Sequence, residues 1–191
     1  TDTQLSFYGA TKKTNEIMAH SYSHLWNIPT TMFRFFTVYG PWGRPDMAHF
    51  KFVSSILNEK LIDIYNEGNM CRDFTYIDDL VLAIKLLIDA IPNINDGAKI
   101  FEKDSISSVA PFRVVNIGNS TKIKLIDFVE TIEDALGKKS IRNLMPMQKG
   151  DVISTWADAS LLNQITNYSP KTNIKEGISN FVKWYREYYG V

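Results

Sequence analysis

Segments typical of β-strands alternate with segments typical of α-helices along the whole chain, and this alternation most limits its possible folds. Runs rich in β-branched and aromatic residues lie at 30–37, 61–65, 74–77, 113–117 and 140–144. Helical patterns lie at 9–26, 46–59, 78–91, 125–136 and 174–189. Parallel strands need a crossover between them, which is usually a helix. The alternation therefore predicts an α/β chain with a parallel sheet.

Prolines and acidic residues mark several element boundaries. Pro29 separates the first helix from the first strand, and Pro41 and Pro45 separate that strand from the second helix. Asp46 and Asp78 stand at the starts of two helices, where a carboxylate can accept hydrogen bonds from free backbone N–H groups. We therefore expect both aspartates to be helix caps.

The composition excludes several classes of protein. The 191 residues are 45% hydrophobic and 22% charged, and 21 basic side chains balance 21 acidic ones, which predicts an ordinary globular chain without a nucleic-acid partner. A single cysteine, Cys71, excludes an internal disulfide framework, and no long apolar run predicts a membrane span. We expect a cytoplasmic protein in which residues 93–110 form a polar surface loop.

Residues 8–12 read Tyr-Gly-Ala-Thr-Lys and place a phenol and an ammonium one helical turn apart. A neutral phenol is a poor base, but a nearby cation favours the phenolate. Lys12 can therefore activate Tyr8 and also bind a nucleotide ribose on the same helix face. So short a motif arises by chance about 0.7 times in such a chain, so the flanking motifs decide its meaning.

Two further motifs follow in order. TMFRFFTVYGPWGRPDMA occupies 31–48, and RDFTYIDD occupies 72–79. Together with the Tyr-x-x-x-Lys pair they resemble the extended short-chain dehydrogenase/reductases that act on nucleotide sugars, and FRFFTVYGPWGRPDMA resembles the UDP-glucuronate 4-epimerases in particular. The resemblance continues through VVNIGNS, MPMQKGDV and FVKWYREYY, which lie at 114–120, 145–152 and 181–189.

The resemblance implies a remnant of a Rossmann-type parallel sheet interleaved with a smaller α/β substrate-binding domain. Residues 1–40 would be the end of the NAD-binding Rossmann domain, with the Tyr-x-x-x-Lys helix. Residues 41–191 would mainly form the nucleotide-sugar-binding domain, while segments near 74–91 and 112–118 would return to the Rossmann part.

The family also has a Gly-rich strand-turn-helix near its amino end that holds the NAD pyrophosphate. None of the 10 glycines here lies in such a motif. We therefore expect the carboxy-terminal half of an enzyme, and we expect these 191 residues alone to show neither tight NAD binding nor turnover.

The resemblance assigns residues to catalysis and to the cofactor, which it implies is NAD. Tyr8 and Lys12 would be the catalytic pair and would also contact NAD. Phe35 and Phe36, at the end of the strand at 30–37, would lie on the cofactor side. The alternative is that Tyr8 and Lys12 are a surface pair on an amphipathic helix.

The resemblance assigns seven residues to the nucleotide-sugar substrate, namely Thr37, Arg44, Met47, Ala48, Tyr65, Arg72 and Asp151. Thr37 would face the sugar, and Arg44 would match a phosphate or carboxylate with two hydrogen bonds. Tyr65 would lie beside the uracil, and Asp151 near the ribose. A strand residue, a solvated loop charge and a simple turn are the alternatives for Thr37, Arg44 and Asp151.

The diphosphate would be held at two places. The helix start at Met47 and Ala48 offers free backbone N–H groups, which suit a phosphate. Arg72 matches the arginine that clamps the diphosphate in relatives, although a surface ion pair is the alternative. The family usually has a second basic residue at the position of Cys71, so some positive charge is missing there.

The implied function is NAD-dependent epimerisation at C4 of a UDP-sugar acid, UDP-glucuronate to UDP-galacturonate, through a 4-keto intermediate in the full-length enzyme. The alternatives are another nucleotide-sugar epimerase, decarboxylase or 4,6-dehydratase, or an inactive carboxy-terminal fragment that only binds nucleotide or dimerises.

The expected partners are the UDP-sugar and a second copy of the chain, with no nucleic acid and no membrane. The family pairs the helix that carries Tyr8 with its twofold mate, and this helix offers apolar residues for such a contact, which are Ile17, Met18, Tyr22 and Leu25. His20 and His24 have the spacing of a metal pair, but we expect a solvated helix face there and no metal.

Overall fold

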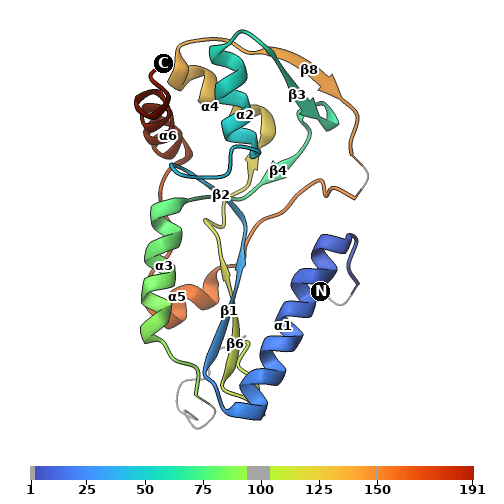
Figure 1. The fold of residues 1–191 in the computed structure, drawn as a ribbon, viewed down its shortest axis with the longest axis vertical. Coiled ribbons are helices and arrows are strands. Elements are labelled where there is room, and N and C mark those ends of the chain that lie inside the picture. The colour runs from blue at the N-terminus through green and yellow to red at the C-terminus, as the bar shows by residue number, and fades with distance from the viewer. Residues whose placement is uncertain (1–2, 94–103, 149) are drawn as a thin grey trace. The chain divides into compact units, whose positions relative to one another are not determined.

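The computed structural model describes residues 3–93, 104–148 and 150–191, and its chain forms two compact units (Figure 1). Unit 1 contains Thr1–Phe35, Leu82–Ile117 and Asp158–Ser169. Unit 2 contains Phe36–Val81, Gly118–Ala157 and Pro170–Val191. Each unit is therefore assembled from three separate stretches of sequence.

Unit 1 is built on a pair of parallel strands. β1 (Thr30–Phe35) pairs with β6 (Phe112–Ile117), and α1 (Phe7–Trp26) and α5 (Ser160–Thr166) pack against this pair. Ser6 caps α1 by accepting a hydrogen bond from the backbone N–H of Gly9 at 3.1 Å. The first element of the chain is thus a helix with a well-defined start, immediately before Tyr8.

Unit 2 contains three further strand pairs. β2 (Thr37–Tyr39) is parallel to β5 (Phe74–Tyr76), and β3 (Leu61–Tyr65) is parallel to β8 (Ile141–Met145). The two-residue strands β4 (Cys71–Arg72) and β7 (Ile123–Lys124) are antiparallel. Three of the four pairs that the described residues form are parallel, which confirms the predicted α/β class.

Three helices and a short turn complete unit 2. These are α2 (Ala48–Leu57), the 3-10 turn η1 (Asn66–Gly68), α4 (Leu125–Leu136) and α6 (Ile174–Tyr189). α3 (Ile77–Asp89) begins in unit 2 and ends in unit 1. In the part of the chain that the structure describes, no helix is both long and apolar enough to cross a membrane.

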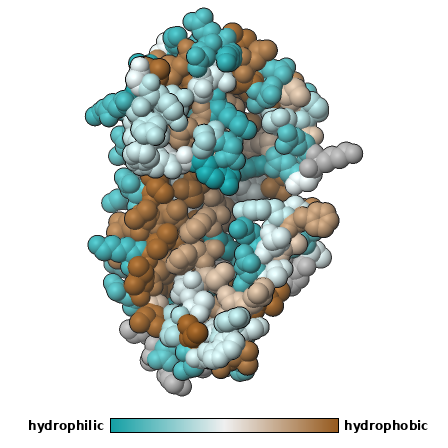
Figure 2. Space-filling model, viewed as in Figure 1, coloured by the Kyte–Doolittle hydropathy of each residue, from teal (hydrophilic) through white to brown (hydrophobic). Residues whose placement is uncertain are grey.

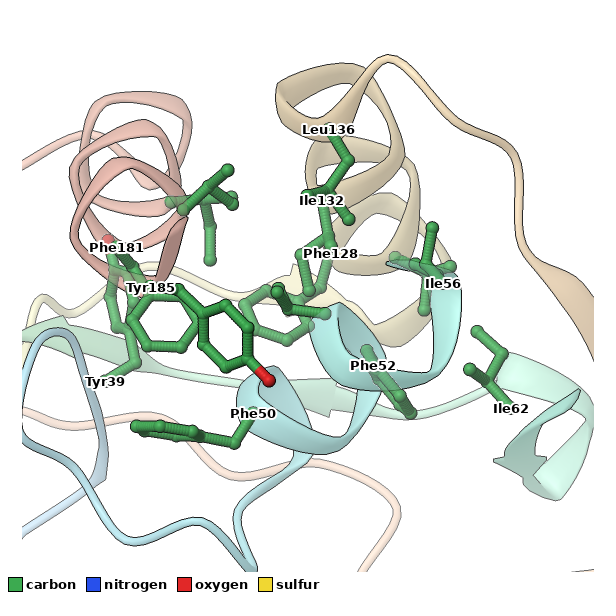
Figure 3. Close-up of a cluster of buried hydrophobic side chains, with 14 of the residues drawn as sticks. Tyr39, Phe50, Phe52, Ile56, Ile62, Phe128, Ile132, Leu136, Phe181 and Tyr185 are labelled. Carbon is green, nitrogen blue, oxygen red and sulfur yellow. The ribbon is translucent and has the colours of Figure 1, made fainter. Parts of the chain in front are cut away.

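An aromatic core holds the helices of unit 2 to its strands (Figure 3). Phe74 of β5 stacks on Phe128 of α4 with ring centroids 4.1 Å apart, and Tyr39 of β2 lies beneath α6. α6 approaches so closely that a β-carbon at Gly177 would lie 2.1 Å from the Tyr39 hydroxyl oxygen. The close approach requires glycine, although glycine lowers intrinsic helix stability by about 1 kcal/mol.

The predicted strand at 30–37 is wrong as a single element. Phe36 interrupts it, and the two halves, β1 and β2, pair with different strands and belong to different units. Phe36 has a strand-forming side chain, so its local preference does not reveal the break. The choice of ladder partner, which depends on distant residues, sets the boundary.

Both predicted aspartate caps are also wrong. Met47 is the residue at the cap position of α2 and makes no side-chain cap bond, while Asp46 pairs with Arg44 instead. α3 begins at Ile77, so Asp78 lies in its first turn rather than before it. An aspartate in the first turn still interacts favourably with the helix dipole, so an aspartate near a helix start does not by itself mark the cap position.

One face of unit 1 is apolar. Figure 2 shows apolar side chains gathered in the region where Figure 1 draws α3, and the side chains of Leu82, Ile88 and Ile91 are exposed there. Most of the predicted loop at 93–110 lies outside the described residues. Among the described residues, this part of unit 1 leaves a surface of the kind that other polypeptides cover.

A buried carboxylate fixes the connection between α4 and β8. Glu133 is only 2% exposed and accepts hydrogen bonds from the backbone N–H of Ser140 at 3.1 Å and from Arg142 Nη2 at 2.9 Å. The Ser140 hydroxyl also donates to it, and Lys139 Nζ lies 2.9 Å away. Burial alone would raise the pKa of Glu133, but these donors outweigh burial and lower it to about 2.

This lowered pKa predicts a stability that depends on pH. Ionised Glu133 stabilises the fold fully above its unfolded pKa of 4.5, and the contribution disappears as pH falls through that value towards about 2. We expect Glu133→Gln to lower the free energy of unfolding by roughly 2 to 3 kcal/mol at pH 7 and by less than half as much at pH 3. Urea unfolding at the two pH values measures both numbers.

A control variant is available in the same helix. Glu130 lies 3.7 Å from Arg142 but is 53% exposed, so Glu130→Gln should change the free energy of unfolding by less than about 0.5 kcal/mol. An equal loss for Glu133→Gln at pH 7 and pH 3 would show that its charge does not stabilise the fold.

Candidate functional site

A cleft of about 760 Å³ lies within unit 2. It is lined by residues of β2, α2, β3, β4 and β5, and by the segment that follows β8. Five of the seven predicted substrate residues line it, which are Thr37, Ala48, Tyr65, Arg72 and Asp151. The fold therefore brings residues from distant motifs into one concave surface of a size typical for small-molecule sites.

Arg72 is firmly placed on this surface. Its Nη2 donates to Asp151 Oδ1 at 2.7 Å, and its Nη1 donates to the carbonyl oxygens of Cys71 at 2.9 Å and Ile153 at 3.4 Å. The side chains of Arg72 and Asp151 are 21% and 35% exposed. A guanidinium carries five N–H donors, so these contacts can coexist with a bound anion.

The start of α2 borders the same cleft. Ala48 is its first residue and lines the cleft, and Met47 leaves the first turn without a side-chain cap. Helix N-termini of this kind bind phosphate through their backbone N–H groups and the helix dipole. Ala48 and Arg72 thus offer two types of anion-binding group in one cleft.

Arg44 and Met47 are not among the residues that line the cleft, although Pro45 and Asp46 are. Arg44 Nε lies 3.2 Å from Asp46 Oδ1, and Arg44 Nη2 donates to the Met47 sulfur at 3.6 Å. The Arg44 side chain is 75% exposed, so the bond restrains it little. The structure places Arg44 beside the rim residue Asp46.

Thr37 is attached to a residue that sequence reasoning missed, Asp73. The backbone N–H of Thr37 donates to the Asp73 carbonyl at 3.0 Å. The Asp73 carboxylate is fully buried and accepts three backbone N–H groups, from Asn119 at 3.0 Å, Ser120 at 2.8 Å and Ala157 at 2.9 Å. Burial raises the pKa of Asp73, and the three N–H donors oppose that rise.

Gly118 allows the chain to pass close to Asp73. A β-carbon at position 118 would lie 2.4 Å from that of Ala157 and 3.0 Å from Asp73 Oδ2. The signal for Asp73 in the sequence was an acidic residue directly before a strand-like run, but its partners are backbone groups that no sequence pattern marks. Asp73 lies next to Arg72 in the chain and hydrogen-bonds Thr37, so it fixes both cleft residues.

Tyr8 and Lys12 are in unit 1, on α1. Lys12 Nζ lies 5.2 Å from the centroid of the Tyr8 ring, a cation–π distance, and Tyr8 is 71% exposed. Phe35, the last residue of β1, is 49% exposed and stacks on Phe33. Phe36 is the first residue of unit 2. The phenol and the ammonium are thus close to each other on an accessible helix face.

An ion pair that the sequence analysis did not identify joins α1 to β1. Arg34 Nε donates to Glu16 Oε1 at 2.6 Å and Arg34 Nη2 donates to Glu16 Oε2 at 2.7 Å. Hydrogen bonds from Arg34 hold the pKa of Glu16 below its usual range. Glu16 follows Tyr8 and Lys12 at the same four-residue spacing, which is the signal that could have shown it.

The two histidines of α1 correct another expectation. His20 is half-buried and its Nε2 is 2.9 Å from the Ser107 hydroxyl, so the expected solvated face is wrong at this position. His24 is exposed, as expected, although its Nδ1 is 2.7 Å from the Val109 carbonyl oxygen. Both rings attach the segment before β6 to α1. In the described ranges, no cluster of three metal-ligating side chains occurs.

The Glu16–Arg34 pair yields a prediction about the stability of α1. Glu16→Gln keeps the shape but loses the charge, so it should lower the free energy of unfolding by about 1 to 2 kcal/mol and speed hydrogen exchange in α1. Lys13 contacts the same carboxylate at 3.4 Å, and Lys13→Gln should cost less than about 0.5 kcal/mol. Equal effects of the two variants would contradict a special role for the Arg34 pair.

A family model described as the NAD dependent epimerase/dehydratase family matches residues 1–101, more than half of the chain. The chain belongs to this family. The match confirms the predicted family and, with it, the predicted class of cofactor.

Curated relatives within this family match nearly the whole chain. A probable UDP-glucuronate 4-epimerase of Rhizobium meliloti is 52% identical over 190 residues, which are 98% of this chain and 55% of the relative. Protein CapI of Staphylococcus aureus is 53% identical over 188 residues, 98% of this chain and 56% of the relative. The chain therefore spans about half the length of the curated relatives it matches.

Solved structures of this family have the same fold. The UDP-glucuronic acid 4-epimerase of Bacillus cereus in complex with UDP-glucuronic acid and NAD is 30% identical, with a TM-score of 0.81 over 97% of this chain and 54% of that one. MoeE5 in complex with UDP-glucuronic acid and NAD is 27% identical, with a TM-score of 0.80 over 96% and 56%. The predicted Rossmann-like α/β fold is thus confirmed.

Proposed function

We propose that the chain is the sugar-nucleotide-binding part of an NAD-dependent 4-epimerase that interconverts UDP-glucuronate and UDP-galacturonate. The observation that carries the proposal is the cleft of unit 2, which collects residues of three separate motifs in one site. Relatives named as UDP-glucuronate 4-epimerases, which match nearly all of the chain, support the same substrate.

The polar groups of the cleft suit a nucleoside diphosphate sugar. Arg72 and the start of α2 at Ala48 would hold the diphosphate, because a guanidinium and free backbone N–H groups both bind phosphate oxygens. Asp151 would accept hydrogen bonds from the ribose, Tyr65 would contact the uracil and the Thr37 hydroxyl would bind the sugar. Arg44 and Met47 would close the rim over the diphosphate.

The residues of unit 1 suit NAD. Lys12 can donate hydrogen bonds to ribose hydroxyls, and the exposed ring of Phe35 offers apolar contact to a nicotinamide ring. Phe36, the next residue in the chain and the first of unit 2, is proposed for the same cofactor contact. NAD held by these residues would supply reversible hydride transfer at C4 of the sugar. These residue types fit the cofactor that the family name gives.

Tyr8 would move the proton that accompanies this oxidation. As a phenolate, Tyr8 Oη would take the proton of the sugar 4-hydroxyl, and Lys12 at 5.2 Å from the ring would stabilise the phenolate. After the 4-keto sugar has rotated and C4 has received the hydride on its other face, Tyr8 would return the proton to the oxygen on C4. Thr37 would orient the C5 carboxylate, which a neighbouring ketone makes prone to leave as CO₂.

Binding and product analysis test the proposal. The 191-residue chain should bind UDP-glucuronate by calorimetry. In the full-length enzyme, NMR of the product should show UDP-galacturonate. A pentose product would indicate a decarboxylase instead, and a 6-deoxy product a 4,6-dehydratase. Failure of the chain to bind any uridine nucleotide would overturn the assignment of the cleft.

Two cleft variants should separate the diphosphate from the sugar. Arg72→Ala removes a charge-assisted contact and should weaken UDP binding about tenfold to a hundredfold. Thr37→Ala should weaken UDP-glucuronate binding and leave UDP unchanged. Lys124, opposite Cys71 in the β4–β7 pair, provides a control, since Lys124→Ala should change neither affinity by more than about threefold. Equal losses of both ligands in Thr37→Ala would contradict its assignment to the sugar.

We also propose a homodimer in the cytoplasm that supplies a sugar nucleotide for polysaccharide synthesis. The side chains of Ile17, Met18, Tyr22 and Leu25 on α1 are each more than half exposed, which supports a helix-to-helix contact. Sedimentation should show a dimer or larger species at micromolar concentration, and Met18→Glu should shift it towards monomer. A folded monomer throughout that range would contradict the contact.

A further inference from the structure

We propose that Asp151 is an internal counter-ion of Arg72 that competes with bound phosphate, so that the cleft selects nucleotides over free phosphates. The proposal rests on the proposed function, since it takes Arg72 as the group that receives the diphosphate. The observation that carries it is the 2.7 Å ion pair between the two side chains inside the cleft.

The pair is fixed from both sides. Asp151 Oδ1 also accepts the backbone N–H of Val152 at 2.8 Å, and Gly150, with a φ of 83°, makes the turn that leads into it. On the other side of the pair, Arg72 Nη1 donates to the backbone carbonyl oxygens of Cys71 and Ile153. These hydrogen bonds therefore hold the Asp151 carboxylate in one position on the anion-binding surface.

The charges that line the cleft make this arrangement unfavourable for a bare anion. Among the described residues that line the cleft, the cationic side chains are Lys51 and Arg72, and the acidic ones are Asp46, Asp63 and Asp151. A phosphate that approaches Arg72 meets a carboxylate bound to the same guanidinium, and two anions on one cation repel each other. Replacing Asp151 by a neutral residue would leave equal numbers of cations and anions.

A nucleotide escapes this penalty because it carries hydroxyl groups. When the diphosphate shares Arg72 with Asp151, a ribose hydroxyl can donate to the Asp151 carboxylate and offset the weakened ion pair. Pyrophosphate has no such donor and offers Asp151 no compensation. The exchange makes Asp151 a specificity-determining residue for the nucleotide.

Calorimetry with inorganic pyrophosphate and with UDP tests the proposal on the 191-residue chain. Asp151→Asn keeps the acceptor for the Val152 N–H and removes the charge, so pyrophosphate affinity should rise about three- to tenfold. The ratio of UDP affinity to pyrophosphate affinity should fall by at least the same factor. In an Arg72→Ala background, the gain from Asp151→Asn should be smaller.

A matched control separates the local pair from overall charge. Asp134 of α4 is 73% exposed, lies outside the cleft lining and is 3.9 Å from Lys139, so Asp134→Asn removes a charge from another ion pair. It should leave pyrophosphate affinity within about twofold. The inference would be overturned if Asp151→Asn bound pyrophosphate no more tightly than the unsubstituted chain does. It would also be overturned if neither of these two proteins bound pyrophosphate. Loss of UDP-glucuronate binding alone would instead refute the proposed substrate.

Discussion

The arrangement of the cleft depends on one buried carboxylate, that of Asp73. This carboxylate accepts three backbone N–H groups from two distant segments, and the main-chain carbonyl of Asp73 accepts the N–H of Thr37. A fully buried carboxylate is tolerated only when it is well hydrogen-bonded, so the three donors must stay in place together. Because Arg72 directly precedes Asp73 in the chain, any shift of Asp73 also moves Arg72 in the cleft.

The carboxylates of unit 2 show how burial and partners set different roles. Glu133 is buried among a serine and two cations and attaches β8 to α4. Asp73 is buried among neutral backbone donors and joins β5 to the segments at 119–120 and 157. Asp151 is partly exposed, and its ionic partner among the described residues is Arg72. The first two stabilise the fold, whereas the third remains accessible to a ligand.

The sequence predicts the long elements well and the short ones poorly. The bounds of β3, α4 and α6 agree with the predicted ranges, because their periodicity is strong and Gly137, in a left-handed conformation, ends α4. β4, β7 and α5 were missed, since elements of so few residues are fixed by their partners rather than by local preference. The break at Phe36 was missed for the same reason.

The candidate site was also predicted only in part. The motifs predict Thr37, Ala48, Tyr65, Arg72 and Asp151 as substrate residues, and the fold places all five along one concave surface. Asp73, which holds Thr37 and Arg72 in place, was not predicted because its carboxylate binds backbone groups. The Glu16–Arg34 pair of unit 1 was not predicted because its two residues lie on different elements. Sequence patterns show side chains, while much of the support for this site comes from the main chain.

The close packing of Gly177 on Tyr39 has a consequence for how sequences of this fold can diverge. A β-carbon at position 177 would meet the Tyr39 hydroxyl oxygen and also its ring carbons Cζ and Cε2, at 2.7 and 2.8 Å. Removing the hydroxyl alone would not make room, so a larger residue at 177 needs a side chain smaller than phenylalanine at 39. The two positions, far apart in the chain, should therefore change together during evolution or not at all.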